Sequence, residues 1–320
     1  GLWIEPEMVS EDSQLYHEHP DWALSVPGRS YTRGRSQLVL DFSREEVRDY
    51  IYDALREVLS QANITYLKWD MNRSLTEVWS AALPADKQGE VYHRYVLGVY
   101  ELLERFHRDY PHILIEGCSG GGGRFDGGML YYTPQIWCSD NTDAVDRLRI
   151  QYGTSFCYPP CTMGAHVSAV PNETNRRVTP LETRGVVAMS GVFGYEMDLS
   201  RTTEEEQTVI AGQVERYKAC WDLVSEGDYY RLSDPFADGP YTAWAHVSQD
   251  KRRALVSVVT GSTRAALPFF ALRIKGLDPT LRYRVNGGES YPGDVLMQAG
   301  YPLPVFQGDY QSLQLCLEAE

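Results

Sequence analysis

The chain has 320 residues, of which 43% are hydrophobic and 12% aromatic, a composition that is typical of a folded protein and excludes a mainly disordered one. This length can bury a large core, and we expect one large domain with a smaller companion. The formal net charge of -14 excludes nucleic acid and anionic lipid as partners unless a local basic patch exists, and the sequence contains no such patch.

The cysteines are sparse and unevenly spaced, unlike the dense disulfide framework of a small secreted domain. We therefore expect a reducing, cytoplasmic environment. The sequence lacks an apolar run of about 18 residues, so we expect no membrane-spanning segment. The chain begins at Gly1 without a methionine and within a predicted strand, which indicates that the natural N-terminus is missing.

Short apolar runs alternate with longer helical patterns over the first two thirds of the chain, which indicates β/α units around a parallel sheet. Helices are predicted at 44–61 with Ser43 as N-cap, at 90–109, and at 203–226 with Thr202 or Thr203 as N-cap. The predicted strands, in chain order, are 1–4, 37–41, 65–69, 112–116, 135–138, 163–167 and 192–197.

After about residue 227 the sequence changes to short alternating segments at 254–260, 281–285 and 312–316, with Asn286-Gly287-Gly288 as a hairpin signal. A complete (β/α)8 TIM barrel needs about 250 residues and eight strands. Fewer strands are visible here. We therefore predict an α/β fold in which a barrel that is incomplete at its N-terminus occupies 1–226 and a small antiparallel β-sandwich occupies 227–320.

Acidic residues follow several of the predicted strands. The side chains just beyond the carboxyl ends of barrel strands meet at the mouth of the barrel, so such residues converge although they are far apart in sequence. This geometry favours Asp70 and Asp140 as a pair. The acidic clusters are Glu5 and Glu7 in WIEPE, Asp41 in LVLDF, Asp70 in YLKWDMNR, and Asp140 and Asp143 in WCSDNTDA.

Two carboxyl groups suit glycoside hydrolysis, because one attacks the sugar while the other protonates the departing oxygen. Lys68 projects to the same side of its strand as Asp70 and would keep that carboxyl ionised. Asp140 has no adjacent cation and follows Trp137, surroundings that favour a general acid. A strand-end aspartate is also commonly a helix cap or an ion-pair partner, and spacing alone leaves both interpretations open.

The glycine run from Glu116 to Arg124 does not satisfy a phosphate-binding motif, which leaves a ligand-approaching loop or a plain turn. The sequence does not predict a metal site, because the histidines are scattered and Cys157 and Cys161 have no second ligand pair. We expect no metal and no cofactor. Cys118 and Ser119 lack the partners that a nucleophile of their type requires.

Several segments together resemble family 36 of the glycoside hydrolases, the bacterial α-galactosidases. The motifs keep the order of the family and cover most of the chain. The resemblance implies a retaining double displacement that releases terminal α-galactose from oligosaccharides such as melibiose and raffinose. The segments are GLWIEPEMVS, GRSQLVLD, YLKWDMNR, HRYVLGVYELL, IEGCSGGGGRFDGGMLYYTPQIWCSDNTDA, RLRIQYGTS and MGAHVSAVPN.

The resemblance also implies roles for individual residues. Matching K-W-D-M-N-R makes Asp70 the nucleophile, and matching S-D-N-T-D makes Asp140 the acid/base. The sugar-binding positions that match are Trp3, Arg35, Lys68, Cys118 and Gly120.

The sequence departs from the family at Ser36, where Asn is usual, and at Gly117, where Ser is common. The family's N-terminal β-sandwich and first two barrel strands, with an Asp-Asp pair that binds galactose, have no counterpart here, so this piece by itself could lack activity. An α-galactosyl transferase, a non-catalytic galactoside-binding fragment and a metal-dependent hydrolase remain competing hypotheses. The resemblance also implies a homotetramer.

Overall fold

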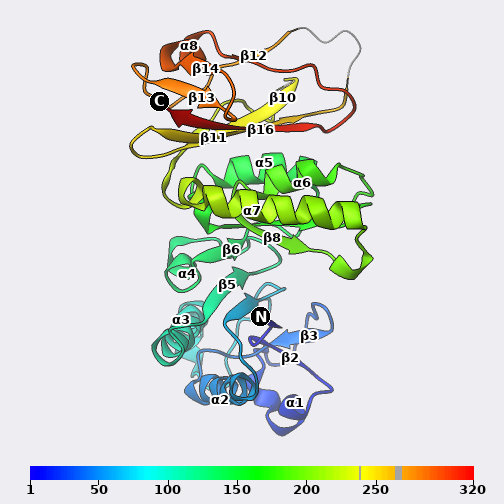
Figure 1. Cartoon of the computed structure of the whole chain (residues 1–320). Helices are drawn as coiled ribbons and strands as arrows, with labels where there is room; N and C mark the ends of the chain where they lie inside the picture. The colour runs from blue at the N-terminus through cyan, green and yellow to red at the C-terminus, as the bar shows by residue number, and fades with distance from the viewer. Residues whose placement is uncertain (238, 264–268) are drawn as a thin grey trace. The chain divides into compact units, whose positions relative to one another are not determined.

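The computed structural model describes residues 1–237, 239–263 and 269–320, and it divides into two compact units, Gly1–Trp137 and Cys138–Glu320 (Figure 1). In the described part of the chain, no helix combines the length and the apolar character that crossing a membrane requires.

The first unit is built around four parallel strands in the order β1-β4-β5-β6. Leu67 and Trp69 of β4 are buried, and each strand is followed by a loop or a helix, as in a β/α barrel. Four of the predicted strands are thereby confirmed. The bounds in this unit are β1 Leu2–Ile4, β2 Met8–Ser10, α1 Gln14–Glu18, β3 Gln37–Val39, α2 Glu45–Gln61, β4 Tyr66–Asp70, α3 Val91–Asp109, β5 Leu114–Cys118, α4 Gly127–Tyr132 and β6 Gln135–Trp137.

The predicted strand at 37–41 is not a member of the parallel sheet. Its residues form β3, which pairs antiparallel with β2 through Met8↔Val39 and Ser10↔Gln37. The apolar side chains of Leu38 and Leu40 are buried, so the hydrophobic signal was real. The short apolar run identified a strand correctly but could not identify the partner with which it pairs.

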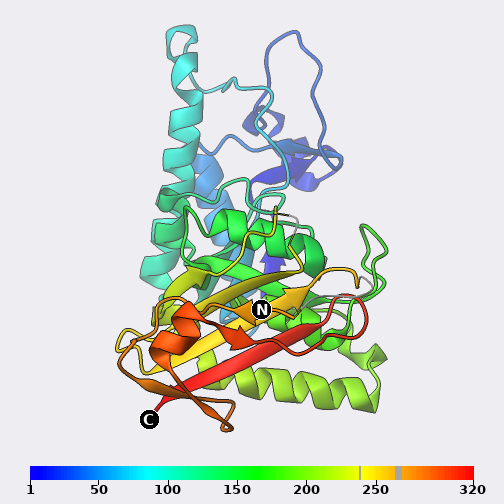
Figure 2. The ribbon, with the colours of Figure 1, turned by 90° about the horizontal axis from the view of Figure 1, so that it is seen from above.

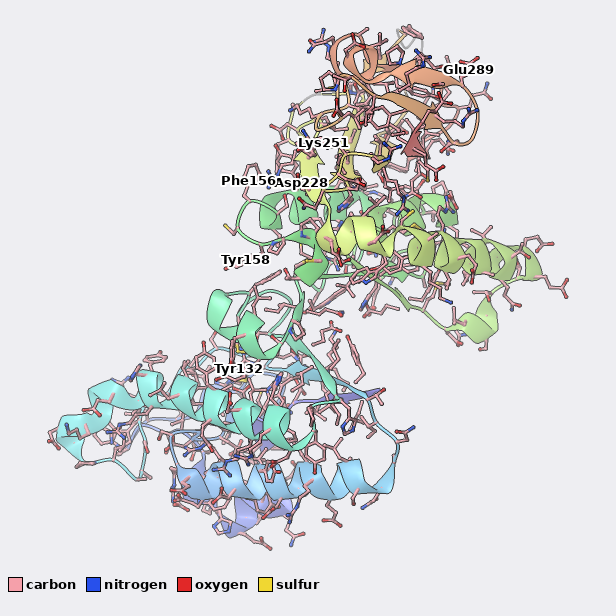
Figure 3. The ribbon with its side chains drawn as sticks, turned by 60° about the vertical axis from the view of Figure 1, so that its left-hand side comes forward. Tyr132, Phe156, Tyr158, Asp228, Lys251 and Glu289 are labelled. Carbon is pink, nitrogen blue, oxygen red and sulfur yellow. The ribbon has the colours of Figure 1, made fainter. Side chains whose placement is uncertain are left out.

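Helices α2 and α3 lie side by side, as Figure 3 shows, and the core of the first unit lies between them and the strands. The N-cap prediction for α2 is wrong. The helix begins after Arg44, which makes no side-chain capping bond. Ser43 donates instead from its hydroxyl to Asp41 Oδ1, so the strand-end aspartate holds the serine that would have capped the helix.

The second unit contains two parallel strands, β7 and β8, and an antiparallel sheet in the order β14-β13-β16-β11-β10-β9. In Figure 1 the helices α5, α6 and α7 form a layer between β8 and the antiparallel sheet. Thr203 caps α7 through a capping box with Glu206, which confirms one of the two predicted caps. The bounds so far are α5 Ala144–Thr154, β7 Met163–Ser168, α6 Leu181–Ala188, β8 Val192–Glu196, α7 Glu204–Glu226, β9 Asp228–Arg231, β10 Tyr241–Val247 and β11 Arg253–Thr260.

The C-terminal part forms the predicted small antiparallel β-sandwich. Figure 2 shows the long strand β16 lying along the sheet, and its apolar core also includes residues from the β12–β15 pair and α8. Asn286 and Gly287 both have positive φ, 48° and 68°, in the predicted hairpin between β13 and β14. The remaining bounds are β12 Ala271–Leu272, β13 Arg282–Val285, β14 Ser290–Pro292, α8 Gly293–Gln298, β15 Tyr301–Pro302 and β16 Ser312–Ala319.

Candidate active site

Asp70 is the last residue of β4 and is 5% exposed. Its Oδ2 accepts a hydrogen bond of 3.1 Å from the indole Nε1 of Trp3, which lies on the neighbouring strand β1. Its Oδ1 is buried and has no hydrogen-bond partner among the residues that the structure describes. A buried carboxylate oxygen without a partner is costly, so this atom is available to a ligand.

Lys68 lies two residues before Asp70 in the same strand, and therefore on the same face. Its recorded ion pair is with Glu116 of β5, Nζ to Oε1 at 3.3 Å, and its Nζ lies 4.7 Å from the centroid of the Trp137 ring. The expectation that Lys68 acts on Asp70 thus omitted Glu116, which is 1% exposed. Glu116 holds the ammonium group in place.

Glu116 is not among the predicted site residues, because in the sequence it stands out only as the start of the glycine run. It also accepts hydrogen bonds from the hydroxyl of Tyr66 and, at 3.2 Å, from Nε2 of Gln135. Its position at the end of an apolar strand indicates a buried carboxylate, and a buried carboxylate needs a hydrogen-bond donor. The parallel register pairs it with Lys68.

Arg35 reaches the site through Glu5. Its Nη1 donates to Glu5 Oε1 at 2.8 Å, and the same oxygen accepts from Nδ2 of Asn72 at 2.5 Å. Asn72 Oδ1 in turn accepts from the backbone N–H of Gly120 at 3.2 Å. These bonds connect four separate loops, and the sequence reasoning gave no role to Glu5 or Asn72.

The turn that carries Arg35 explains one departure from the family pattern. Gly34 and Gln37 are bridged antiparallel, and both residues between them, Arg35 and Ser36, have positive φ, 54° and 61°. Asn adopts this left-handed conformation more readily than Ser does. Ser36 therefore strains a turn that Asn would fit better.

The other departure is at Gly117 in β5. A Cβ added there would lie 2.9 Å from Thr133 Oγ1, so in this chain the neighbouring threonine occupies the space that a serine would need. Cys118 follows, paired in register with Asp70. Burial, together with the adjacent Asp70, raises the pKa of the Cys118 thiol to about 12, so this cysteine is protonated at neutral pH and is a poor nucleophile.

The glycine run forms a tight loop between β5 and α4. Gly120 and Gly121 have φ of 53° and 81°, and the N–H of Gly123 donates to the carbonyl of Ser119 at 3.2 Å. A cavity of about 470 Å³ borders this loop. Its lining includes Met71, Asn72, Leu75, Tyr95, Tyr100, Ser119, Gly120, Arg124 and Met129.

Asp140 lies in the second unit, in the segment that leads into α5, and its side chain is exposed. Asp143, in the same acidic cluster, is the N-cap of α5, accepts from the N–H groups of Val145 and Asp146, and forms an ion pair with Arg177. The capping interpretation therefore holds for Asp143 and leaves Asp140 as the carboxylate of that segment without a capping role.

Asp41 also proves to be structural. Its Oδ1 accepts from the N–H and hydroxyl of Ser43, and its Oδ2 accepts from the hydroxyl of Ser80. Within residues 1–237, 239–263 and 269–320, no three His, Cys, Asp or Glu side chains are grouped in a way that could hold a metal ion.

Parallel β/α units with a buried carboxylate at a strand end have the architecture of a barrel enzyme. Residues 1–227 match the melibiase family, and residues 241–317 match the glycosyl hydrolase family 36 C-terminal domain. The chain belongs to family 36 of the glycosyl hydrolases.

Two relatives are similar along nearly the whole chain. Alpha-galactosidase AgaA of Geobacillus stearothermophilus is 54% identical over 319 residues, which cover 100% of this chain and 44% of that protein. The bifunctional alpha-galactosidase/sucrose kinase AgaSK of Mediterraneibacter gnavus is 53% identical over 315 residues, which cover 98% of this chain and 33% of that protein. The chain thus spans less than half the length of these relatives.

Solved structures of the same proteins give the same relationship. The crystal structure of AgaA superposes with a TM-score of 0.97 at 54% identity, over 100% of this chain and 44% of that one. The galactosidase domain of AgaSK superposes with a TM-score of 0.95 at 51% identity, over 99% of this chain and 43% of that one. The incomplete barrel followed by a β-sandwich is therefore the fold of the corresponding part of these enzymes.

Proposed function

We propose that the protein to which this chain belongs is a retaining α-galactosidase that hydrolyses terminal non-reducing α-D-galactosyl residues of melibiose- and raffinose-type oligosaccharides. The observation that carries this proposal is the state of Asp70. One of its oxygens is oriented by Trp3, and the other is buried with no hydrogen-bond partner in the described ranges. A carboxylate held in this way is suited to attack on an anomeric carbon.

In the proposed reaction, an oxygen of Asp70 forms a bond to C1 of galactose while the glycosidic bond breaks. Asp140 gives its proton to the departing oxygen, which leaves with the bonding electron pair. Asp140 then takes a proton from water, the water oxygen bonds to C1, and the ester to Asp70 breaks. Two inversions at C1 return galactose in the α-configuration.

Complexes of the Geobacillus enzyme support the choice of these two aspartates. The complex with raffinose carries an Asp-to-Asn substitution, and the complex with stachyose carries an Asp-to-Ala substitution. The two substituted aspartates are separated in that sequence by the same number of residues as Asp70 and Asp140 are here. Both sugars carry α-galactosyl groups, so the substrate class is proposed on the same ground.

The sugar-binding roles follow from side-chain chemistry. Trp3 is 48% exposed and offers a ring face for stacking on galactose, while its indole nitrogen engages Asp70. Lys68, held by Glu116, and Arg35, held by Glu5, offer charged donors to hydroxyl groups. Cys118 and Gly120 are proposed to border the sugar from the loop after β5.

Two other functions are compatible with parts of this site. An α-galactosyl transferase would use the same intermediate on Asp70 but would pass galactose to a second sugar, which product analysis at high sugar concentration distinguishes. A non-catalytic galactoside-binding fragment would bind galactose without turnover. The presence of both Asp70 and Asp140 favours an enzyme over a binding fragment.

We also propose a division into domains, an oligomeric state and a cellular location. The catalytic barrel occupies 1–226 and the β-sandwich domain 227–320, a division supported by the end of α7 at Glu226 and by the family match that ends at residue 227. A homotetramer and a cytoplasmic location are proposed from the family resemblance and from the sparse cysteines, respectively.

The test uses the protein in its natural full length, with Asp70→Gly and Asp140→Gly, on an activated aryl α-galactoside with and without azide. We expect azide to restore turnover of Asp70→Gly as β-galactosyl azide, and of Asp140→Gly as α-galactosyl azide, because azide replaces the nucleophile in the first case and water in the second. Asp12→Gly, in an exposed turn, is the matched control. Wild-type rates in Asp70→Gly would overturn the mechanism.

A further inference from the structure

Glu7 has no role in the proposed chemistry, yet its carboxylate is 0% exposed. Its Oε1 accepts from Trp69 Nε1 at 2.8 Å and lies 2.9 Å from Arg124 Nη2. Its Oε2 accepts from the Tyr95 hydroxyl at 2.6 Å and from Arg124 Nη1 at 3.0 Å. A buried carboxylate is tolerated only when its lone pairs are filled in this manner, so all of these groups are held together.

One arm of this cluster reaches the end of β4. Successive side chains of a strand point to opposite faces, so Trp69 leaves β4 on the face opposite Asp70. The Trp69 ring is 0% exposed and packs edge-on against Phe106 of α3. The bond from Trp69 to Glu7 therefore fixes the backbone next to Asp70 from the opposite face of β4.

A second arm reaches the loop after β5. Arg124 donates from Nε to the hydroxyl of Ser119 at 2.7 Å, while its two Nη atoms face Glu7. Ser119 lies between Cys118 and Gly120, and the loop is tight enough that a Cβ on Gly123 would lie 2.6 Å from the Ser119 carbonyl. Two hydrogen bonds of Arg124, from Nε to Ser119 and from Nη1 to Glu7, thus join the loop to Glu7, while Nη2 contributes an ion-pair contact without a hydrogen bond.

The third donor to Glu7 is the hydroxyl of Tyr95, which lies in α3. Burial, and then the charge of Glu7, raise the pKa of Tyr95, so its hydroxyl remains a donor across the neutral range. Tyr95 and Arg124 both border the cavity of about 470 Å³ beside the loop. The cluster therefore lies against that cavity, whose lining also includes Met71 just after the end of β4.

We propose that Glu7 and Arg124 are positioning residues of the Asp70 site, which set the end of β4 through Trp69 and the loop at 118–120 through Ser119. The inference rests on the proposed α-galactosidase activity. The carboxylate of Glu7 is 0% exposed, so it acts on the site only through the segments that it holds. A pair that served only stability would tolerate replacement of both partners without loss of rate, because removing both leaves no unpaired buried charge.

The experiment compares Glu7→Gln, Arg124→Met and the double variant in the natural full-length protein. We measure kcat and KM on an aryl α-galactoside, the number of sites that bind 1-deoxygalactonojirimycin by calorimetry, and the unfolding midpoint in urea. Each single variant is expected to lose about tenfold or more in kcat per binding site, because small displacements of a reacting group are costly. In the double variant the midpoint should recover toward wild type, while kcat stays low.

A milder pair of variants covers the case in which a single variant fails to fold. Tyr95→Phe removes one donor to Glu7, whereas Tyr52→Phe removes a hydroxyl that donates to Asp109 elsewhere in the same unit. We expect kcat per site to fall about threefold or more in the first variant, since a charge-assisted bond is lost, and to remain unchanged in the second.

Hydrogen exchange of the natural full-length protein gives a readout that does not depend on activity. The amides of 119–124 should exchange faster in Glu7→Gln and Arg124→Met, and equally fast in the double variant. Unchanged kcat per site in Tyr95→Phe and the double variant, or a kcat that returns together with the midpoint, would overturn the inference while leaving an active wild type. A wild type without α-galactoside hydrolysis would instead overturn the proposed function, and this inference with it.

Discussion

Trp3 and Asp70 lie on adjacent parallel strands and are joined by a 3.1 Å hydrogen bond from the indole Nε1 to the carboxylate Oδ2. The bond occupies Oδ2 of the carboxylate. The other oxygen, Oδ1, is buried and has no hydrogen-bond partner among the described residues. The same tryptophan is half exposed, so one side chain both orients the carboxylate and presents a ring to the substrate side. The two tasks can be separated by substitution.

Trp3→Phe keeps an aromatic ring but removes the donor to Asp70. We expect kcat/KM on an aryl α-galactoside to fall by about ten- to a hundredfold, because a hydrogen bond to a charged group contributes about 1.5–3 kcal/mol. Trp221→Phe, at a comparably exposed tryptophan of α7, should leave kcat/KM at the wild-type value. An unchanged value in Trp3→Phe would mean that the bond does not orient Asp70 during the reaction.

The sequence predicted β4 from a short apolar run at 65–69, which contains the buried Leu67 and Trp69, and it placed Asp70 at the end of that run. It could not predict the bonds from Asn72 to Glu5 or from Arg124 to Glu7. These partners lie 67 and 117 positions apart and meet only when the strands are in register. Pairing over such separations leaves no periodic signal in the chain.

Competition between neighbouring side chains limited prediction at shorter range. Ser43 has the residue type and the position of a helix cap, yet Asp41 takes its hydroxyl. At Thr203 the residue two positions upstream is Arg201, whose side chain has no acceptor, and the capping box forms as expected. Whether the hydroxyl caps the helix thus depends on the residue two positions upstream. A capping propensity describes the cap residue alone and does not include this neighbour.

Cys316 of β16 packs against Cys220 of α7 in a small apolar cluster. A hydrogen bond from the Cys220 thiol lowers the pKa of Cys316, against the opposing effect of burial, and the Arg216 and Arg253 charges lower it further. Cys161 is also partly buried, and there burial raises the pKa. Because the thiolate is the reactive form, iodoacetamide at pH 8 should label Cys316 before Cys161.

Peptide mass mapping over a time course measures this order. Cys220→Ala should leave labelling of Cys161 unchanged and should slow that of Cys316, because alanine has no donor that could stabilise the thiolate. Labelling of Cys161 ahead of Cys316 would contradict the assignment of the lowered pKa.

Gly98 lies where α3 crosses the chain at Phe42. A Cβ added at this glycine would lie 1.9 Å from the Phe42 carbonyl oxygen, which also accepts a 2.8 Å bond from Arg48 Nη1. The contact is with backbone, so it cannot be relieved by a rotamer change. Gly98→Ala should lower the free energy of unfolding by about 3 kcal/mol, as overpacking does.

Gly212 provides the matched control for that substitution. It lies within α7, and a Cβ there would meet nothing within 4 Å. Gly212→Ala should raise the free energy of unfolding by about 0.5–1 kcal/mol through reduced backbone freedom of the unfolded chain. Urea unfolding of both variants at pH 7 measures the two values, and equal effects of the two substitutions would exclude the close approach at Phe42.

His246 in β10 is 1% exposed, and neither ring nitrogen has a hydrogen-bond partner in the described part of the chain. Burial lowers the pKa of His246 to about 4. Above about pH 6.5 the imidazole is neutral in both the folded and the unfolded state, and it contributes no pH dependence. As the pH falls from about 6.5 toward 4, the unfolded chain binds the proton and the folded chain does not, so stability decreases.

Between pH 7 and pH 5 this difference should lower the free energy of unfolding by about 2 kcal/mol, given the folded and unfolded pKa values and about 1.4 kcal/mol per unit. His246→Leu removes the titrating group from a buried position and should remove that decrease. His17→Leu, at an exposed histidine of α1, should retain it. Urea unfolding at the two pH values measures all three proteins, and a His246→Leu chain that loses stability as steeply as wild type would place the titration on another group.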